Sequence, residues 1–407
     1  MKNWESVKLG DLYEVHNGLS KGGKFFGSGY PFLTFSTVFN NYFLPEELTD
    51  FVQSTEKERE SYSILRGDVF VTRTSETSDE LGMSCVALKD YPNATYNGFT
   101  KRMRPITDRV LPEYIGYYMR MPSFRGEFQA FSTMTTRASL KNEDLLSLEV
   151  KLPEIGEQKK IAGILSAYDA LILNNQKQIK LLEEVAQRLY KEWFVDLQFP
   201  GHENTEIVDG LPEGWRSGRA DDFFEITIGK TPPRAEKQWF VKGNEGIAWA
   251  SISDMGNAGA FLFNTSEGLT EDAVSNHNMK VVPVGTILLS FKLTLGRVSI
   301  TTKPMCTNEA IAHFRLDYPE DREYAYSYLK NFEYDTLGNT SSISKAVNSK
   351  IIKAMPFIMP GELIKTEYSK RVAPILDDIY TKQKQIISLT EARDRLLPKL
   401  MSGQIEL

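Results

Sequence analysis

The sequence predicts an α+β fold of two similar α/β heads and two long helices, with the helices packed as an antiparallel coiled coil and the halves related by pseudo-two-fold symmetry. Two observations carry this prediction. The first is an internal repeat that covers both heads, and the second is a heptad pattern of apolar residues after each copy. A chain of 407 residues is long enough for two or three such domains.

The repeat is visible at the start, in the middle and at the end of each copy. At the start, residues 4–15 align with residues 215–226, and both segments begin with a tryptophan. In the middle, 65–71 matches 283–289, where a turn glycine precedes an apolar strand. At the end, 145–153 matches 352–360. Three matches in the same order indicate a duplication.

Each copy ends at a proline that is followed by apolar residues four and three positions apart, which is the spacing of a coiled-coil seam. The central seam position is polar in both helices, and such a position can fix the register. The alternative is two amphipathic helices that each lie on their own head. The predicted seam consists of Ile161, Leu165, Tyr168, Ile172, Asn175, Ile179, Leu182 and Leu189 in the first helix and Ile379, Lys382, Ile386, Leu389 and Leu396 in the second.

Pro374 lies inside the second pattern, where its ring removes a backbone donor and clashes with the preceding turn. We therefore expect a kink there, or a helix that begins near residue 374. Arg393 also occupies a seam position, so the second pattern is weaker than the first.

The connection between the first helix and the second head is short, so antiparallel helices need no long return path. The predicted parts follow from these boundaries. They are 1–152 (first head), 153–196 (central helix), 197–211 (linker), 212–360 (second head) and 361–407 (C-terminal helix).

Composition and charge exclude several classes of protein. Hydrophobic residues at 41% and charged residues at 25% are typical of a folded globular chain. No apolar span of membrane length and no signal-peptide core is present, so we expect a cytoplasmic protein. Two distant cysteines and four scattered histidines support neither a disulfide framework nor a metal site. A net charge of −6 argues against binding a polyanion by bulk positive potential.

The usual catalytic motifs are absent. Residues 18–25 resemble a phosphate-binding loop, but Phe25 stands where a Ser or Thr would bind magnesium. In the second copy, Pro232 and Pro233 would break the helix that such a loop requires. We find no serine-hydrolase, zinc-protease, dinucleotide-binding or amino-methyltransferase motif. We therefore expect a chain that is not an enzyme and holds no cofactor or metal of its own.

Polar loops with hydroxyl groups beside Arg or Lys recur in both heads. Such groups form hydrogen bonds with phosphates and base edges, although a polar loop is more often simply solvated. The recurrence favours DNA as the ligand. The candidate DNA-binding residues are Arg73, Ser75, Lys101, Arg102, Thr136 and Arg137 in the first head and Lys230, Thr231, Ser251, Ser253, Lys292, Thr294, Ser342 and Lys345 in the second.

Three stretches give the chain a resemblance to a known family. They are LPEIGEQKKIAGIL at 152–165, KEWFVD at 191–196 and LPEGW at 211–215. With the order head, helix, head, helix, the whole chain resembles the specificity (S) subunit of Type I restriction-modification systems. Gly156 departs from the pattern, because a leucine is often found there.

The resemblance implies that each head is a target recognition domain for one half of a bipartite, asymmetric DNA target. It further implies that the helix pair sets the gap between the halves and docks two methyltransferase (M) subunits, with restriction (R) subunits in the full complex. S-adenosylmethionine, ATP and magnesium would be used by those partners. Partners that hold the duplex would also remove the objection from net charge. The alternative is a two-headed coiled-coil adaptor that binds proteins or glycans rather than DNA.

Overall fold

The computed structural model describes residues 4–75, 80–130, 138–243, 245–337, 347–405 and 407. The chain divides into two compact units. Unit 1 comprises Met1–Ile172 and Ser388–Leu407, and unit 2 comprises Leu173–Ile387. The boundary therefore crosses both long helices, so that each unit contains one head and a segment of each helix.

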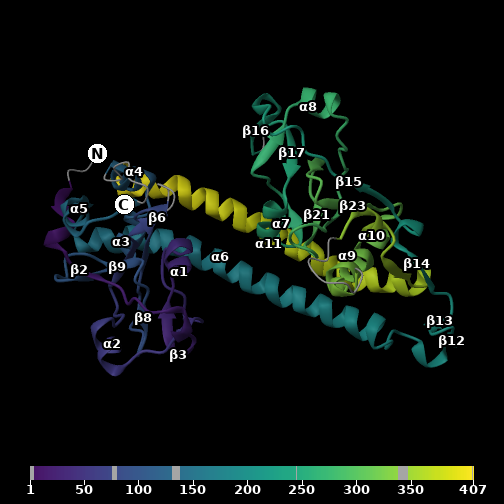
Figure 1. The fold of residues 1–407 in the computed structure, drawn as a ribbon, viewed down its shortest axis with the longest axis horizontal. Coiled ribbons are helices and arrows are strands. Elements are labelled where there is room, and N and C mark those ends of the chain that lie inside the picture. The colour runs from purple at the N-terminus through teal and green to yellow at the C-terminus, as the bar shows by residue number, and fades with distance from the viewer. Residues whose placement is uncertain (1–3, 76–79, 131–137, 244, 338–346, 406) are drawn as a thin grey trace. The chain divides into compact units, whose positions relative to one another are not determined.

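Unit 1 holds the first head, in which a four-stranded sheet in the order β2-β9-β5-β7 lies beside a smaller sheet in the order β4-β3-β8. Figure 1 shows α3 beside the larger sheet and α2 beside the smaller one. The strands are β1 (Glu5–Lys8), β2 (Tyr13–Asn17), β3 (Phe26–Leu33), β4 (Phe51–Val52), β5 (Val69–Thr72), β6 (Thr74–Ser75), β7 (Ser84–Val86), β8 (Thr95–Tyr96), β9 (Thr100–Pro105), β10 (Ala138–Ser139) and β11 (Glu149–Leu152). The helices of this head are α1 (Phe35–Asn40), α2 (Glu56–Ser61), α3 (Pro112–Tyr118), α4 (Pro122–Ala130) and α5 (Asn142–Ser147).

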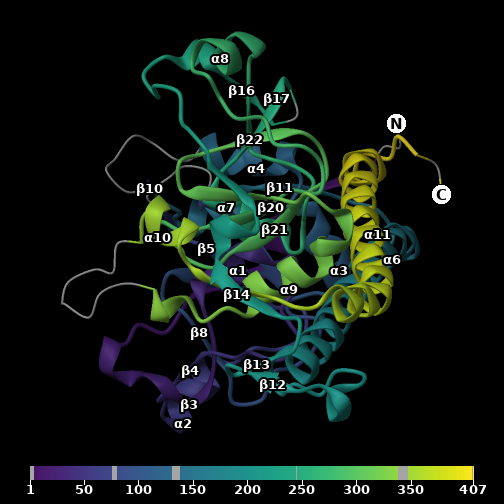
Figure 2. The ribbon, with the colours of Figure 1, turned by 90° about the vertical axis from the view of Figure 1, so that its right-hand side faces the viewer.

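Unit 2 holds the second head, with a five-stranded sheet in the order β15-β23-β20-β21-β18 and a four-stranded sheet in the order β16-β19-β17-β22. Figure 2 shows α8, β16 and β17 at one end of this head and α9 and β14 at the other. The strands are β12 (Ile207–Val208), β13 (Leu211–Pro212), β14 (Arg216–Arg219), β15 (Glu225–Ile228), β16 (Phe240–Lys242), β17 (Ile247–Ala250), β18 (Phe261–Leu262), β19 (Glu267–Leu269), β20 (Ile287–Ser290), β21 (Val298–Thr301), β22 (Met305–Thr307), β23 (Ile311–Arg315) and β24 (Pro356–Met359). The helices of this head are α7 (Ile252–Ala258), α8 (Glu271–Asn276), α9 (Arg322–Asn331) and α10 (Ser349–Lys353).

The predicted repeat is present in the backbone. The first strand of each head pairs antiparallel with the last, β1 with β11 and β14 with β24. The registers are equivalent, because Val7 lies opposite Val150 in unit 1 and Gly218 lies opposite Phe357 in unit 2. In both heads a tyrosine forms a hydrogen bond with the last strand, from α3 in unit 1 and from α9 in unit 2. Tyr114 donates to the carbonyl of Lys151 (2.7 Å), and Tyr324 donates to that of Ile358 (2.6 Å).

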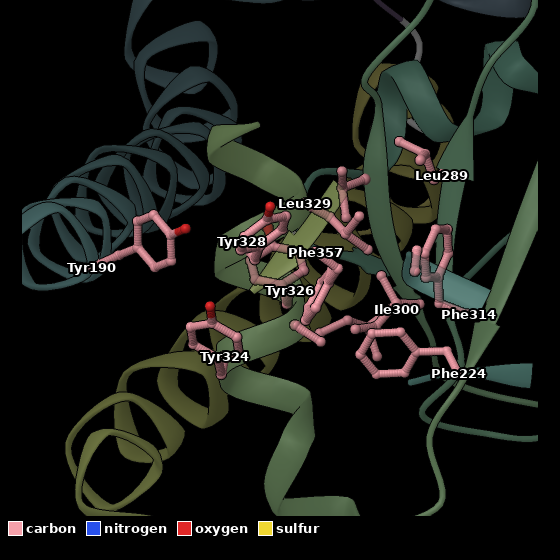
Figure 3. Close-up of a cluster of buried hydrophobic side chains, with 14 of the residues drawn as sticks. Tyr190, Phe224, Leu289, Ile300, Phe314, Tyr324, Tyr326, Tyr328, Leu329 and Phe357 are labelled. Carbon is pink, nitrogen blue, oxygen red and sulfur yellow. The ribbon is translucent and has the colours of Figure 1, made fainter. Parts of the chain in front are cut away.

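The core of unit 2 gathers aromatic side chains between the head and its helix segments (Figure 3). The rings of Tyr328 and Phe357 lie 4.2 Å apart between centroids, and Tyr190 of the first long helix reaches Tyr324 at 6.3 Å. Burial of such large rings is the main favourable term in this packing.

The two long helices are α6 (Ile155–Tyr190), which continues into a π-helical turn at Lys191–Val195, and α11 (Glu362–Met401). In unit 1 the start of α6, with Ile161 and Leu165, shares one buried cluster with the end of α11, which contributes Leu397 and Leu400. In unit 2 the end of α6 meets the start of α11, and the ring centroids of Trp193 and Tyr368 are 5.8 Å apart.

The helix segments are therefore antiparallel within each unit. Each head packs against parts of both helices, which rules out helices that fold back separately onto their own heads. All of the predicted seam positions are buried or half-buried. The polar position at the centre of the first helix is occupied by Asn175, which donates to the side-chain oxygen of Gln385 (3.2 Å).

The expectation that the second helix begins near Pro374 is wrong, because α11 runs without interruption from Glu362 to Met401. Pro374 and Lys370 are both exposed. The carbonyl of Lys370, which loses its helical donor to the proline ring, can therefore be hydrated. Among the described residues, no helix is long and apolar enough to cross a membrane.

Candidate nucleic-acid interface

In both heads the same three turns meet at one end of the larger sheet. In unit 1 the turn after β2 is tied to the turn before β9, since the amide of Leu19 donates to the carbonyl of Tyr96 (2.9 Å). The loop after β5 joins them, since the amide of Arg73 donates to the carbonyl of Phe99 (3.0 Å). We call this arrangement the turn cluster of unit 1.

The turn cluster of unit 2 has the same backbone hydrogen bonds. The amide of Lys230, after β15, donates to the carbonyl of Thr307 (2.9 Å). The amide of Phe291, after β20, donates to the carbonyl of Ala310 (2.9 Å). An asparagine builds the middle turn in both heads: the side-chain oxygen of Asn97 accepts from the amide of Phe99, and that of Asn308 accepts from the amide of Ala310.

A glycine in each turn cluster makes the close approach possible. A Cβ atom on Gly18 would lie 2.0 Å from the carbonyl oxygen of Asn97, and one on Gly229 would lie 2.1 Å from the hydroxyl oxygen of Thr307. No other residue fits at either position without a shift of the backbone. Packing therefore explains Gly18 and Gly229, whereas a Cβ atom on Gly22 or Gly23 would have no neighbour within 4 Å.

Polar side chains of opposite charge converge at the turn cluster of unit 2. Thr231 donates its hydroxyl to the carboxylate of Glu309. This hydrogen bond is the largest influence on the pKa of Glu309, which lies below its usual value, and Lys292 and Arg234 lower it further. The carboxylate is thus ionised, and the candidates Thr231 and Lys292 both lie near it, together with Arg234.

Arg234 belongs to this surface but was missed by sequence reasoning. Its guanidinium lies 4.5 Å from the ring centroid of Phe240 and 4.6 Å from that of Trp249, and it pairs with Glu267 at 2.8 Å. Stacking and pairing hold an exposed guanidinium in one orientation, which suits recognition of a planar or anionic group. The only signal in the sequence is an arginine directly after two prolines.

The other candidates in unit 2 have different surroundings. Lys230 extends its ammonium group to the carbonyl of Asn278 (3.3 Å). Ser251 caps α7, where it accepts from the amide of Asp254 (3.2 Å), so its hydroxyl has a structural role. Ser253 and Thr294 are exposed, on the first turn of α7 and on the loop after β20.

In unit 1 the structure places Arg73 at the turn cluster, half-buried, with one guanidinium nitrogen 3.3 Å from the side-chain oxygen of Asn17. Ser75 belongs to β6, whose backbone pairs with Ala138 of β10. Four further candidates lie outside the described residues. They are Thr136, Arg137, Ser342 and Lys345.

The prediction that Lys101 and Arg102 face DNA is corrected by their burial. Both lie on β9, inside the sheet, and are only 5% and 3% exposed. Arg102 donates to the carbonyl of Ser63 (2.7 Å), and Lys101 donates to Asn142. Burial lowers the pKa of Lys101, and the nearby Arg73 lowers it further. These cations join elements within the head and are not available to a ligand at the surface.

A second surface that the sequence did not reveal lies on the smaller sheet of unit 1. The guanidinium of Arg59 lies 3.8 Å from the ring centroid of Tyr30, and the ammonium groups of Lys21 and Lys24 each lie 5.1 Å from that of Phe25. Tyr30 is 39% exposed, whereas Lys21 is paired with the carboxylate of Glu58 (2.8 Å). Aromatic rings beside cations bind single-stranded nucleic acids through stacking and charge.

The chain is similar in sequence to proteins named as specificity subunits of Type I restriction enzymes. The family model described as Type I restriction modification DNA specificity domain matches residues 1–184 and 212–391. The specificity subunit of the Type I restriction enzyme MjaIX from Methanocaldococcus jannaschii is 26% identical over 422 residues, which cover 99% of this chain and 94% of that one. The HindI specificity subunit from Haemophilus influenzae is 24% identical over 478 residues, which cover the whole of both chains.

A similar fold is found in a crystal structure of the S subunit of a Type I restriction-modification system from M. genitalium. The TM-score is 0.56 at 16% sequence identity, and the match covers 98% of this chain and 96% of that chain. The family model matches each copy of the repeat separately, and together the two matches span most of the chain. The chain therefore belongs to the family of the Type I restriction modification DNA specificity domain and carries that domain twice.

Proposed function

We propose that this chain is the non-catalytic DNA-reading subunit of a Type I restriction-modification complex, and that each head reads one half of a bipartite, asymmetric target. The observation that carries the proposal is the pair of turn clusters. Their backbones are held by equivalent hydrogen bonds, whereas the side chains they present differ: Arg73 and Phe99 in unit 1, Thr231, Lys292 and Glu309 in unit 2.

Equivalent frames with different side chains suit this task. Backbone-held turns fix where a side chain meets the duplex, and the side chain decides which base edge it accepts. Two different sets of side chains would then read two different half-sites. Losing a base-reading side chain would cost roughly 1 to 3 kcal/mol at one position of the target.

We further propose that the helix pair sets the gap between the half-sites and docks methyltransferase subunits. An apolar strip on α6 supports docking. Leu181 and Val185 are 60% and 52% exposed, and because they lie one helical turn apart they share one face of the helix. Exposed apolar side chains at that spacing suit contact with a partner. S-adenosylmethionine, ATP and magnesium are then assigned to the partner subunits.

Sequencing of methylated positions in the host genome, with and without the gene for this chain, tests the proposal. We expect methylation at a split, asymmetric sequence that disappears without the chain. In a gel shift with the co-purified partner subunits, we expect retention of duplexes that contain this sequence. Retention that does not depend on sequence would favour the adaptor and contradict DNA reading.

The spacer is tested by adding one heptad to α6 after Asn175 and one to the facing part of α11, so that the seam keeps its register. Seven residues lengthen a helix by about 10 Å, which corresponds to about 3 base pairs of duplex. We expect the gap in the methylated sequence to increase while both half-sites stay the same. A change in the half-sites would contradict the role of the helices as a spacer.

A further inference from the structure

The loop after β20 in unit 2 presents an apolar side chain in an unfavourable position. Leu293 is fully exposed, and its backbone has φ +61°, in the left-handed region that leucine rarely adopts. Glycine or asparagine would relieve the strain, and any polar residue would suit the exposure. The folded chain thus gains nothing from a leucine at this position.

The loop is nevertheless held firmly. The amide of Thr294 donates to the carbonyl of Lys292 (2.7 Å), which closes a tight turn around Leu293. The hydroxyl of Ser290 donates to the carbonyl of Thr294 (2.6 Å) and accepts from the amide of Arg297 (3.0 Å). Arg297 in turn donates to a carbonyl of α7 (2.6 Å). A strained residue that its surroundings hold in place is characteristic of functional sites.

The position of Leu293 relates it to the turn cluster. The loop that carries it begins at Phe291, whose amide is bonded to the turn cluster of unit 2. Its neighbour Lys292 is one of the cations that lower the pKa of Glu309. Leu293 is therefore an exposed residue of the same loop as the candidate Lys292, directly after it in the chain.

Unit 1 has a counterpart on a different turn. Phe99 belongs to the turn between β8 and β9, where its amide donates to the side chain of Asn97 (2.6 Å) and its carbonyl accepts from Arg73 (3.0 Å). Its ring is 60% exposed. The equivalent position in unit 2 holds Ala310, which is buried, so each head presents one large apolar side chain at its turn cluster, from a different loop.

We propose that Leu293 and Phe99 are the apolar base contacts of the two heads: each is pressed against base edges or faces in the groove of its own half-site. Apolar atoms discriminate bases by contact with the thymine methyl group or by wedging between base steps, and neither needs a hydrogen bond. This inference rests on the proposed function, because it assigns specificity-determining residues to the DNA-reading surface.

The test uses the full chain co-purified with its methyltransferase subunits and the target found by sequencing of methylated DNA. The variants are Leu293→Asn, which suits the left-handed backbone, and Phe99→Ala. Binding is measured to the intact target and to duplexes altered at single positions of either half-site. We expect each variant to weaken binding to the intact target roughly tenfold and to relax a position in one half-site only, a different half-site for each variant.

Controls are available at the far ends of the same strands. Val284, before β20, and Ile106, after β9, are 59% and 58% exposed but lie away from the turn clusters. Val284→Ala and Ile106→Ala should bind like the wild type, and Leu293→Met and Phe99→Leu should keep most of the affinity. The inference is overturned if the two test variants bind like the wild type, if both relax the same half-site, or if the controls weaken binding equally. A wild-type complex without any sequence preference would instead refute the proposed function.

Discussion

At equivalent positions near the start of the two long helices, unit 1 has a neutral side chain and unit 2 an ion pair. Gln158 of α6 is fully buried, accepts from the amide of Leu111 (2.8 Å) and donates to two carbonyls. Lys365 of α11 pairs instead with the carboxylates of Asp321 and Glu362. Leu111 and Asp321 are themselves equivalent, since they precede α3 and α9 as N-cap residues.

The reverse difference occurs further along the helices. In unit 1, Arg393 of α11 forms an ion pair with Asp169 of α6 (2.6 Å), Tyr117 donates to the same carboxylate, and the guanidinium lies 5.1 Å from the ring centroid of Tyr42. In unit 2 the same two helical positions hold Ala186 and Leu376, which belong to the buried cluster.

The two units therefore share one backbone arrangement but differ in the side-chain contacts made by their long helices. Where one unit has an ion pair, the other has a neutral or apolar contact. Strand registers and tyrosine contacts agree, because they depend on backbone geometry. The side-chain contacts of the long helices differ, because an ion pair, a hydrogen-bonded amide or an apolar pair can each fill an equivalent buried position. This explains why the repeat is clear in its pattern and weak in its identities.

The largest effect is expected from Lys365→Met. Burial alone would lower the pKa of Lys365, but the pairs with Asp321 and Glu362 outweigh burial and raise it. Without the lysine, the carboxylate of Asp321 is left buried, which costs on the order of 3–5 kcal/mol. Hydrogen exchange in β24 should report this loss in unit 2. Gln158→Met, the matched change in unit 1, should cost only about 1–3 kcal/mol. Equal losses of stability for the two variants would show that the ion pair of Lys365 does not contribute more than the hydrogen bonds of Gln158.

Next in size is Arg393→Ala, which leaves Asp169 without its cation and should destabilise unit 1 by roughly 2–4 kcal/mol. The double variant Asp169→Leu with Arg393→Ala copies the apolar pair of unit 2. It should regain most of the lost stability, since replacing both partners removes the unpaired charge. Urea unfolding of the full chain measures both variants. A double variant no more stable than the single one would mean that an apolar pair cannot replace the ion pair of unit 1.

A pH dependence should distinguish the units as well. His313 of β23 is buried between the hydroxyls of Thr227 (2.9 Å) and Thr307 (2.7 Å), and burial lowers its pKa from 6.5 to about 4. Between these values the unfolded chain binds a proton that the folded chain does not, so stability falls as the pH drops from about 6.5 to 4, by at most on the order of 3 kcal/mol. The equivalent position in unit 1 holds Arg102 in place of a histidine, so unit 1 lacks this contribution at that position.

The measurement is hydrogen exchange in both units from pH 7 to pH 4, for the wild type and His313→Gln. As the pH falls, unit 2 of the wild type should lose protection from exchange more steeply than unit 2 of the variant. The protection of unit 1 should change equally in the two proteins. Parallel curves for the two proteins in unit 2 would mean that His313 does not contribute to acid sensitivity.

The smallest effects test what the units share. Tyr114→Phe and Tyr324→Phe each remove one hydrogen bond to the last strand of a head, and each should cost about 1 kcal/mol. Thermal unfolding of the two variants should show similar shifts. A clearly larger loss for one variant would indicate that the tyrosine contact carries different weight in the two units.

Sequence alone was sufficient for the repeat, the seam and the antiparallel helices, because self-similarity, heptad spacing and the length of a connection can all be read without the fold. It failed for the start of the second helix, since Pro374 is tolerated within α11 where the carbonyl of Lys370 is exposed to water. It also failed for Lys101 and Arg102, whose burial depends on Asn142 and Ser63, both about 40 residues away. The stacked Arg234 likewise needs Trp249, which only the folded head brings near.

The last twenty residues of the chain have a consequence for biosynthesis. Leu397, Leu400 and Met401 complete the cluster that contains Ile161 and Leu165, more than 230 positions earlier. The head that leaves the ribosome first therefore cannot finish its core until residues 397–401 have been made, whereas unit 2 is continuous in sequence and already complete at Ile387. A premature stop near residue 388 would damage the N-terminal head and spare the later one.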